Sequence, residues 1–174
     1  MKKSSVVLKW GIITSVVMCV YSYLLYVTNA AFTMRSLSYL SIVIMVGGLA
    51  MGMIEFRNKV NGGFATFGKQ FGLGMLMTLI IAAISTIYFE VLVASTPYMD
   101  NMLAQSQAEM VNKGMSSEQI EMGMKYAKMF MSPVLMGVFG LIGNAIMGAI
   151  ASLIAAAITS KAAPIGGDNN SIPA

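Results

Sequence analysis

Long uncharged stretches alternate with short charged ones along this chain. It has 25 uncharged residues between Lys9 and Arg35, and then 19 before Glu55. Two further uncharged stretches, of 20 and 32 residues, end at Glu90 and at Lys161. About 20 apolar residues in a helix extend about 30 Å, which is the hydrocarbon thickness of a bilayer. The pattern therefore predicts four transmembrane helices.

The predicted fold is all-α, with four transmembrane helices in an antiparallel bundle. The link between the first two spans has fewer than ten residues, so those helices must run in opposite directions. The tail is rich in Gly, Pro and Asn and is predicted to be flexible. The prediction is a single membrane domain at 1–163, with spans at about 11–27, 37–54, 71–93 and 134–159, followed by the tail at 164–174.

The first span also resembles a signal peptide, because lysines precede its apolar run and Thr28-Asn29-Ala30 is a weak cleavage site. The apolar run is longer than the 7–15 residues usual in a cleaved signal. An uncleaved span is therefore the preferred interpretation.

Residues 97–131, between the third and fourth spans, are predicted to form two short amphipathic helices on the outer side of the membrane. Gly114 ends the first helix, and Ser116 with Gln119 forms a capping box that starts the second. Such helices would lie at the interface or cap the bundle. Their apolar stripes consist of Met99, Leu103 and Met110, and of Ile120, Met124, Ala127 and Met131.

Small and polar residues recur at every fourth position in the third and fourth spans. Such rows form one ridge of a helix and let two backbones approach closely, so these two spans are expected to pack together. Gly48 and Gly52 form a shorter version in the second span. The rows are Gln70, Gly74, Thr78, Ala82, Thr86 and Glu90, and Gly140, Asn144, Gly148, Ser152, Ala156 and Ser160.

The same rows have a functional alternative, in which one faces another protein or lines a polar pathway. Glu90 and Asn144 are its candidate functional residues, because polar groups within the membrane are costly. Glu90 is expected about one turn from the interface, where water can reach it.

Composition agrees with a membrane protein: 57% of residues are hydrophobic and 10% are charged, against about 25% charged in soluble domains. The net charge of +4 reflects lysines that flank the spans, and no basic stretch with interleaved aromatic residues indicates nucleic-acid binding. Seven Lys and Arg residues fall on the side of both termini and four on the other side. The positive-inside rule then places both termini in the cytoplasm.

No catalytic, metal or cofactor site is predicted. The chain has no histidine, and its single Cys19 lies within the first span. Residues 63–69 match the start of a phosphate-binding loop, but Gln70 replaces the required Ser or Thr. The Met-x-Met pairs raise the idea of copper(I) transport, yet residues two apart on a helix point about 200° apart and cannot chelate one ion.

Several landmarks together resemble the domain-of-unknown-function 4199 family of small bacterial membrane proteins. They are Lys9-Trp10-Gly11-Ile12-Ile13, the Gly63…Phe67-Gly68 entry to the third span, Pro97-Tyr98, Pro133, and the ending Ala155-Ala156-Ala157-Ile158…Lys161. The resemblance implies a four-span fold in a bacterial inner membrane. It implies no activity and no functional residues.

The leading functional hypothesis is a non-enzymatic accessory or scaffold subunit of a membrane complex, bound to lipid and to another membrane protein or to itself. The alternative is a small homo-oligomeric transporter or channel whose pathway Thr78, Thr86, Glu90 and Asn144 would line. A third hypothesis is a lipid sensor based on the Met-rich hairpin.

Overall fold

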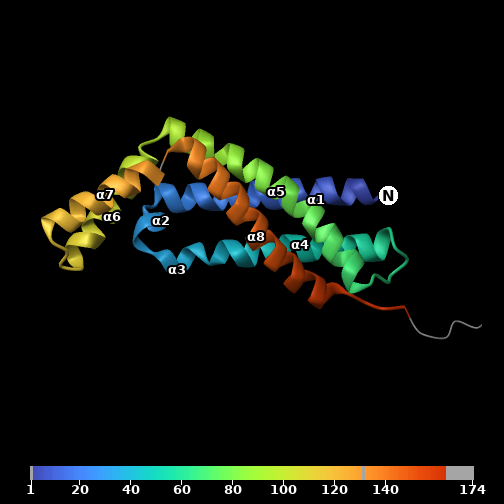
Figure 1. The fold of residues 1–174 in the computed structure, drawn as a ribbon. Helices are drawn as coiled ribbons and strands as arrows, with labels where there is room; N and C mark the ends of the chain where they lie inside the picture. Colours follow the sequence, from blue (N-terminus) through green and yellow to red (C-terminus); the bar gives the residue numbers. More distant parts are fainter. Residues whose placement is uncertain (1, 131, 164–174) are drawn as a thin grey trace, which may run out of the picture.

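A computed structural model describes residues 2–130 and 132–163, and these residues are almost entirely helical (Figure 1). Four helices are long and apolar enough to cross a membrane: α1 (Lys3–Val27), α4 (Leu40–Lys59), α5 (Phe67–Ser95) and α8 (Pro133–Thr159). Between them lie the shorter helices α2 (Ala30–Thr33), α3 (Arg35–Ser38), α6 (Tyr98–Asn112) and α7 (Ser117–Phe130). The described part of the chain has no strand, only an antiparallel bridge between Ala65 and Lys161.

The helices differ in length from the predicted spans. α1 already begins at Lys3, before the predicted start of the span, because a helix continues past the hydrocarbon where lysine side chains can reach water. The link predicted between the first two spans is mostly helical, because it contains α2 and α3. α4 begins at Leu40, three residues after the predicted start of the second span. The predicted tail at 164–174 lies outside the described residues.

The four long helices pack in two directions. α1 and α4 lie beside each other, and α5 and α8 cross them obliquely (Figure 1). The most extensive contacts are those between α5 and α8. The core lies where the helices cross, and its largest side chains are completely buried: Leu49, Met53, Leu73, Met77 and Ile81.

Large apolar side chains cover much of the outside of the four helices. Val20, Leu79 and Ile158 are each more than half exposed. A contiguous apolar surface of this extent is rare on soluble monomers. Together with the four long helices, it makes this chain a multi-pass membrane protein whose solvent over these faces is lipid.

Two turns determine where the chain reverses. Gly62 and Gly63, with φ of 66° and 88°, form the turn between α4 and α5. Gly114, with φ of 69°, separates α6 from α7, and all three φ values are ones that side chains with a Cβ rarely adopt. Figure 1 shows α6 and α7 extending away from the long helices, at the end opposite the start of α1.

The beginning of α7 carries the predicted capping box. The Ser116 backbone N–H donates to Gln119 Oε1 at 2.9 Å, and the Gln119 backbone N–H donates to Ser116 Oγ at 3.3 Å. These two bonds satisfy amide groups that have no partner within the helix.

Candidate functional site

The rows of small residues on α5 and α8 lie against each other along part of their length. Gly74 lies beside Ser152, and Thr78 lies beside Gly148, where an added Cβ would be 1.9 Å from Thr78 Cγ2. The Thr78 hydroxyl donates to the Gly148 carbonyl at 3.4 Å and lies 3.2 Å from the Ser152 hydroxyl. Nothing larger than glycine fits at position 148 without movement, so the side chains here determine how closely the helices approach.

Other residues of the rows are also buried in this packing. Ala82 and Ala156 are 2% and 0% exposed. Gln70 is completely buried and donates from Nε2 to the Met53 carbonyl at 3.2 Å, which ties α5 to α4. These residues therefore lie inside the protein and cannot face a separate partner.

The glycines of α4 receive side chains from α1 instead. An added Cβ at Gly48 would lie 2.1 Å from Thr14 Oγ1, and one at Gly52 would lie 3.0 Å from Trp10 Cβ. Gly52 also faces Met77 of α5, with its Cβ position 2.7 Å from the sulfur. α1, α4 and α5 thus meet around one glycine.

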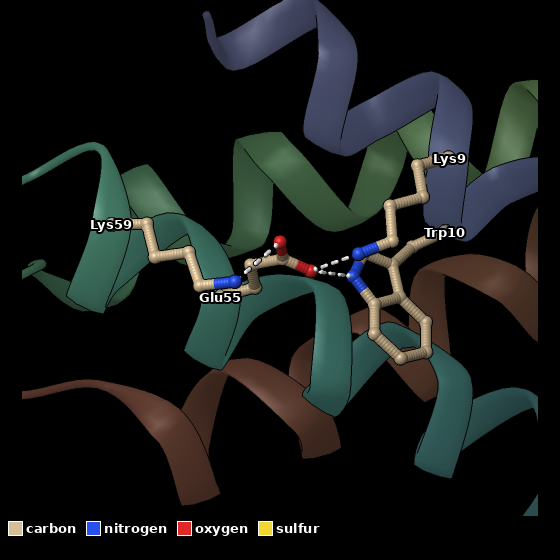
Figure 2. Close-up of polar contacts among 4 residues, drawn as sticks. All are labelled: Lys9, Trp10, Glu55 and Lys59. Carbon is tan, nitrogen blue, oxygen red and sulfur yellow. Dashed lines mark hydrogen bonds and ion pairs between the residues drawn. The ribbon is translucent and has the colours of Figure 1, made fainter. Parts of the chain in front are cut away.

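A polar cluster joins α1 to α4 near the start of α1 (Figure 2). Glu55 accepts hydrogen bonds from Lys9 Nζ at 2.8 Å, Trp10 Nε1 at 2.5 Å and Lys59 Nζ at 3.2 Å. The Glu55 side chain is only 9% exposed, whereas Lys9 and Lys59 reach water. The two cations and the indole N–H all stabilise the charged carboxylate.

No local pattern predicts this cluster, because Trp10 and Glu55 are 45 positions apart in the chain. In the sequence, Glu55 only marks the end of an uncharged stretch.

Two further contacts close the same end of the molecule: Arg57 donates to the Thr159 carbonyl at 2.8 Å, and Ala65 and Lys161 exchange backbone hydrogen bonds. We call this end, where α1 begins and α8 ends, the terminal end.

The opposite end, which we call the α6 end, contains a cavity of about 590 Å³ between the helices. Thr86 of α5 and Gly140 and Asn144 of α8 line this cavity, together with side chains of α1 and α6. These three residues belong to the same rows that pack tightly elsewhere. The structure therefore divides each row into a packed part and a part that faces a cavity.

Glu90 lies beside this cavity. A Cβ added to Gly137, which lines the cavity, would be 2.8 Å from Glu90 Oε1. Within the described residues, no hydrogen bond or ion pair reaches the Glu90 carboxylate. Of the four residues of the hypothetical pathway, Thr86 and Asn144 line the cavity, Glu90 borders it, and Thr78 is sealed in the contact between α5 and α8.

Aromatic side chains form much of the rest of the cavity wall. Tyr98 at the start of α6 packs edge-on against Phe89, with ring centroids 5.6 Å apart, and lies 5.7 Å from the ring of Tyr26. Burial raises the pKa of the Tyr98 phenol. The Thr86 hydroxyl is buried without a hydrogen-bond partner among the described residues.

The chemistry available at either end is limited. Within residues 2–130 and 132–163, no three His, Cys, Asp or Glu side chains lie close enough to hold a metal ion. The Glu55 cluster is a structural contact between two helices. The cavity at the α6 end has the size of a ligand site, since such sites measure about 300–1,000 Å³.

The four apolar helices and the cavity among them define a multi-pass helical membrane protein. Residues 9–161 match the family model described as "Protein of unknown function (DUF4199)". The match covers most of the chain, so the protein belongs to this family. No curated protein and no solved structure matches the chain significantly.

Proposed function

We propose that this protein is a non-enzymatic accessory subunit that holds a partner protein through α7. The observation that carries the proposal is a stripe of apolar side chains on α7 that its own chain leaves uncovered. Met122, Tyr126, Met129 and Phe130 follow helical spacing and are each more than half exposed. We call these four residues the α7 stripe.

The α7 stripe is distinct from the apolar face of α7 that meets α6. Gly123 lies against Met110 of α6, where an added Cβ would be 2.9 Å from the Met110 Cε atom. Ile120, Met124 and Ala127 are only partly exposed. Since α7 turns 100° per residue, Met122 and Ile120 point in nearly opposite directions. α7 therefore has one apolar face toward α6 and a second that is free to bind.

Charge favours a protein over a lipid surface as the occupant of the α7 stripe. Helices that lie on membranes are rich in Lys and Arg, which attract anionic lipids. Residues 98–130 carry four acidic residues and three lysines, a net charge of −1. Tyr, Phe and Met are enriched in the cores of protein interfaces, and methionine adapts easily to a partner's shape.

The proposed setting is a bacterial inner membrane, with the four long helices in an antiparallel bundle. Seven Lys and Arg residues belong to the terminal end and four to the α6 end and the α6–α7 segment. Cytoplasmic loops carry the excess of positive charge, so both termini are cytoplasmic and α6–α7 lies outside. In this arrangement the α7 stripe is available to a partner with an extracytoplasmic domain.

The proposal is tested by purifying the tagged protein in mild detergent and quantifying the proteins that accompany it. The test variant is Met122→Glu with Tyr126→Glu, and the matched control is Lys125→Gln, which changes an exposed polar residue of the same helix. We expect a partner that crosslinks to a photoreactive group at Met129, is lost from the test variant and remains with the control. A partnerless wild-type monomer, or a partner retained equally by all three, contradicts the proposal.

The second candidate function is a small transporter or channel, and the cavity lined by Thr86 and Asn144 favours it. Among the described residues, the completely buried Leu49, Leu73 and Met77 pack between the helices away from the cavity and leave no continuous pathway there. A homo-oligomer would have to supply the rest. Flux through reconstituted vesicles that is unchanged by Glu90→Gln would remove the central residue of this candidate.

A further inference from the structure

The cavity at the α6 end has the properties of a ligand site, and we propose that it binds an amphipathic organic cation, in which an ammonium or similar group is attached to an apolar body. This inference is independent of the proposed accessory function, because the cavity and the α7 stripe share no residue. It rests on the cavity's lining, its charge and its neighbouring carboxylate.

The lining is suited to an apolar body with a few polar contacts. Five aromatic side chains and two methionines line the cavity, and hydroxyl and amide groups lie among them. The Thr86 hydroxyl is buried without a hydrogen-bond partner among the described residues, and the half-buried Asn144 amide also lines the cavity. Because buried polar groups are nearly always satisfied, the Thr86 hydroxyl is available for a ligand or for water.

The charges around the cavity favour a ligand of positive charge. None of the described lining residues is Lys, Arg, Asp or Glu, so nothing in the wall would neutralise an anion. The faces of aromatic rings attract cations, and most strongly where water is excluded. An anionic ligand is disfavoured on both counts.

Glu90 supplies a negative charge beside this wall. Its carboxylate oxygen lies close to Gly137, which lines the cavity, and would be 2.8 Å from a Cβ added there. No basic side chain of the described residues pairs with it. A carboxylate within a transmembrane helix is costly without a compensating charge. A cation in the adjacent cavity would provide that charge.

The cation could be a free molecule or the ammonium of a lipid headgroup. Both share the chemistry argued here, and the membrane composition distinguishes them. Phosphatidylethanolamine carries an ammonium group, whereas phosphatidylglycerol does not. If the lipid is the source, phosphatidylethanolamine in the bilayer will compete with an added cation.

Glycine positions on α8 provide a matched pair of variants for the test. An added side chain at Gly140 or at Gly143 would meet nothing within 4 Å, so both positions accept a larger residue without a clash at its Cβ. Gly140 lines the cavity, whereas Gly143 is exposed on the lipid-facing side. Gly140→Leu fills the cavity, and Gly143→Leu adds the same atoms outside it.

The experiment measures binding of radiolabelled tetraphenylphosphonium to the full-length protein in phosphatidylglycerol nanodiscs, with dodecylammonium and the neutral dodecanol as competitors. We expect saturable binding that dodecylammonium displaces at least tenfold more effectively than dodecanol. Gly140→Leu should abolish binding and Gly143→Leu should preserve it. Glu90→Gln should weaken it about tenfold, as expected for loss of a charged partner, while Glu118→Gln, on the exposed surface of α7, should not.

Each outcome decides the proposal. The proposal is overturned if no saturable binding is seen, if dodecanol competes as well as dodecylammonium, or if Glu90→Gln and the wild type bind with equal affinity. It is also overturned if binding survives in a Gly140→Leu protein that has wild-type elution and thermal stability. If Gly140→Leu does not fold, Asn144→Leu replaces it, with the same expected loss. Adding phosphatidylethanolamine to the nanodiscs then assigns the source: reduced binding identifies the lipid headgroup, and unchanged binding identifies a free cation.

Discussion

Single small residues determine how closely the long helices approach one another. At Gly148 the α8 backbone touches the Thr78 side chain, and at Gly48 the α4 backbone touches Thr14. Lipid provides no hydrophobic force between helices, so such close contacts and the hydrogen bonds beside them must hold the helices together. The hydroxyl of Thr78 contributes both, since it contacts Gly148 and Ser152.

Gly148→Ala is predicted to destabilise the protein by about 1–3 kcal/mol, the usual range for overpacking a tight contact. The new Cβ would lie 1.9 Å from Thr78 Cγ2, whereas the matched control Gly143→Ala would meet nothing within 4 Å. Thermal unfolding in mild detergent measures both variants. Adding Thr78→Ala to Gly148→Ala should restore part of the loss, and equal stability of Gly148→Ala and Gly143→Ala would refute the prediction.

A second prediction at the residue scale concerns the stability that the Glu55 cluster provides. Glu55→Ala should lower the unfolding midpoint more than Lys59→Ala does, because Glu55 links α1 to α4 whereas Lys59 binds Glu55 within one helix. An exposed ion pair within a helix contributes little. Unfolding is monitored by the fluorescence of Trp10, the chain's single tryptophan. Equal effects of the two substitutions would show that the connection between the helices does not stabilise the fold.

At the scale of elements, α5 combines two roles along its 29 residues. Its first half packs against α8 through Gly74 and Thr78, and its second half borders the cavity through Thr86 and Glu90. α7 also has two roles, on different sides of the helix: one apolar face packs toward α6, and the α7 stripe lies on another side. α7 contacts little besides α6, so its own capping must contribute much of its stability.

Ser116→Ala is therefore predicted to loosen α7 while leaving the four long helices unchanged. Loss of a capping side chain costs about 1 kcal/mol, which corresponds to an about fivefold larger population of the open helix and so to faster exchange. Hydrogen exchange of residues 117–123 measures this effect. Ser117→Ala is the control, because the neighbouring serine makes no capping bond in this structure. Unchanged exchange in Ser116→Ala would mean that packing on α6 alone holds α7.

At the scale of the whole molecule, the two ends differ. The terminal end is closed by the Glu55 cluster, by the contact from Arg57 to Thr159 and by the bridge between Ala65 and Lys161. The α6 end instead contains the cavity and the extended α6–α7 segment. Cooperative stability is thus expected to be concentrated at the terminal end, and binding at the α6 end.

The proposed orientation predicts the labelling of single cysteines by a membrane-impermeant maleimide. In a Cys19→Ala background, Asn112→Cys should react in intact spheroplasts, whereas Ser4→Cys and Ala162→Cys should react only after permeabilisation. The reason is the excess of Lys and Arg at the terminal end. Labelling of position 4 in intact spheroplasts would reverse the orientation, and opposite behaviour of positions 4 and 162 would contradict the even number of spans.

The sequence by itself determined the four long helices and the α6–α7 segment, though not the short α2 and α3, because helix length and apolarity follow from local composition. Four uncharged stretches predicted α1, α4, α5 and α8, and Gly114 marked the turn between α6 and α7. The Ser116–Gln119 capping box was also visible, since both partners lie within one helical turn. Each of these features depends on residues close together in the chain.

Only the tertiary structure decided which part of each row packs and which part borders a cavity. Gly140 and Gly148 have the same residue type and lie in the same row, yet one lines the cavity and the other touches Thr78. The contact of Trp10 with Glu55 could not be predicted from the sequence either. Such outcomes depend on the angles at which whole helices cross, and those angles follow from all the contacts together rather than from any local pattern.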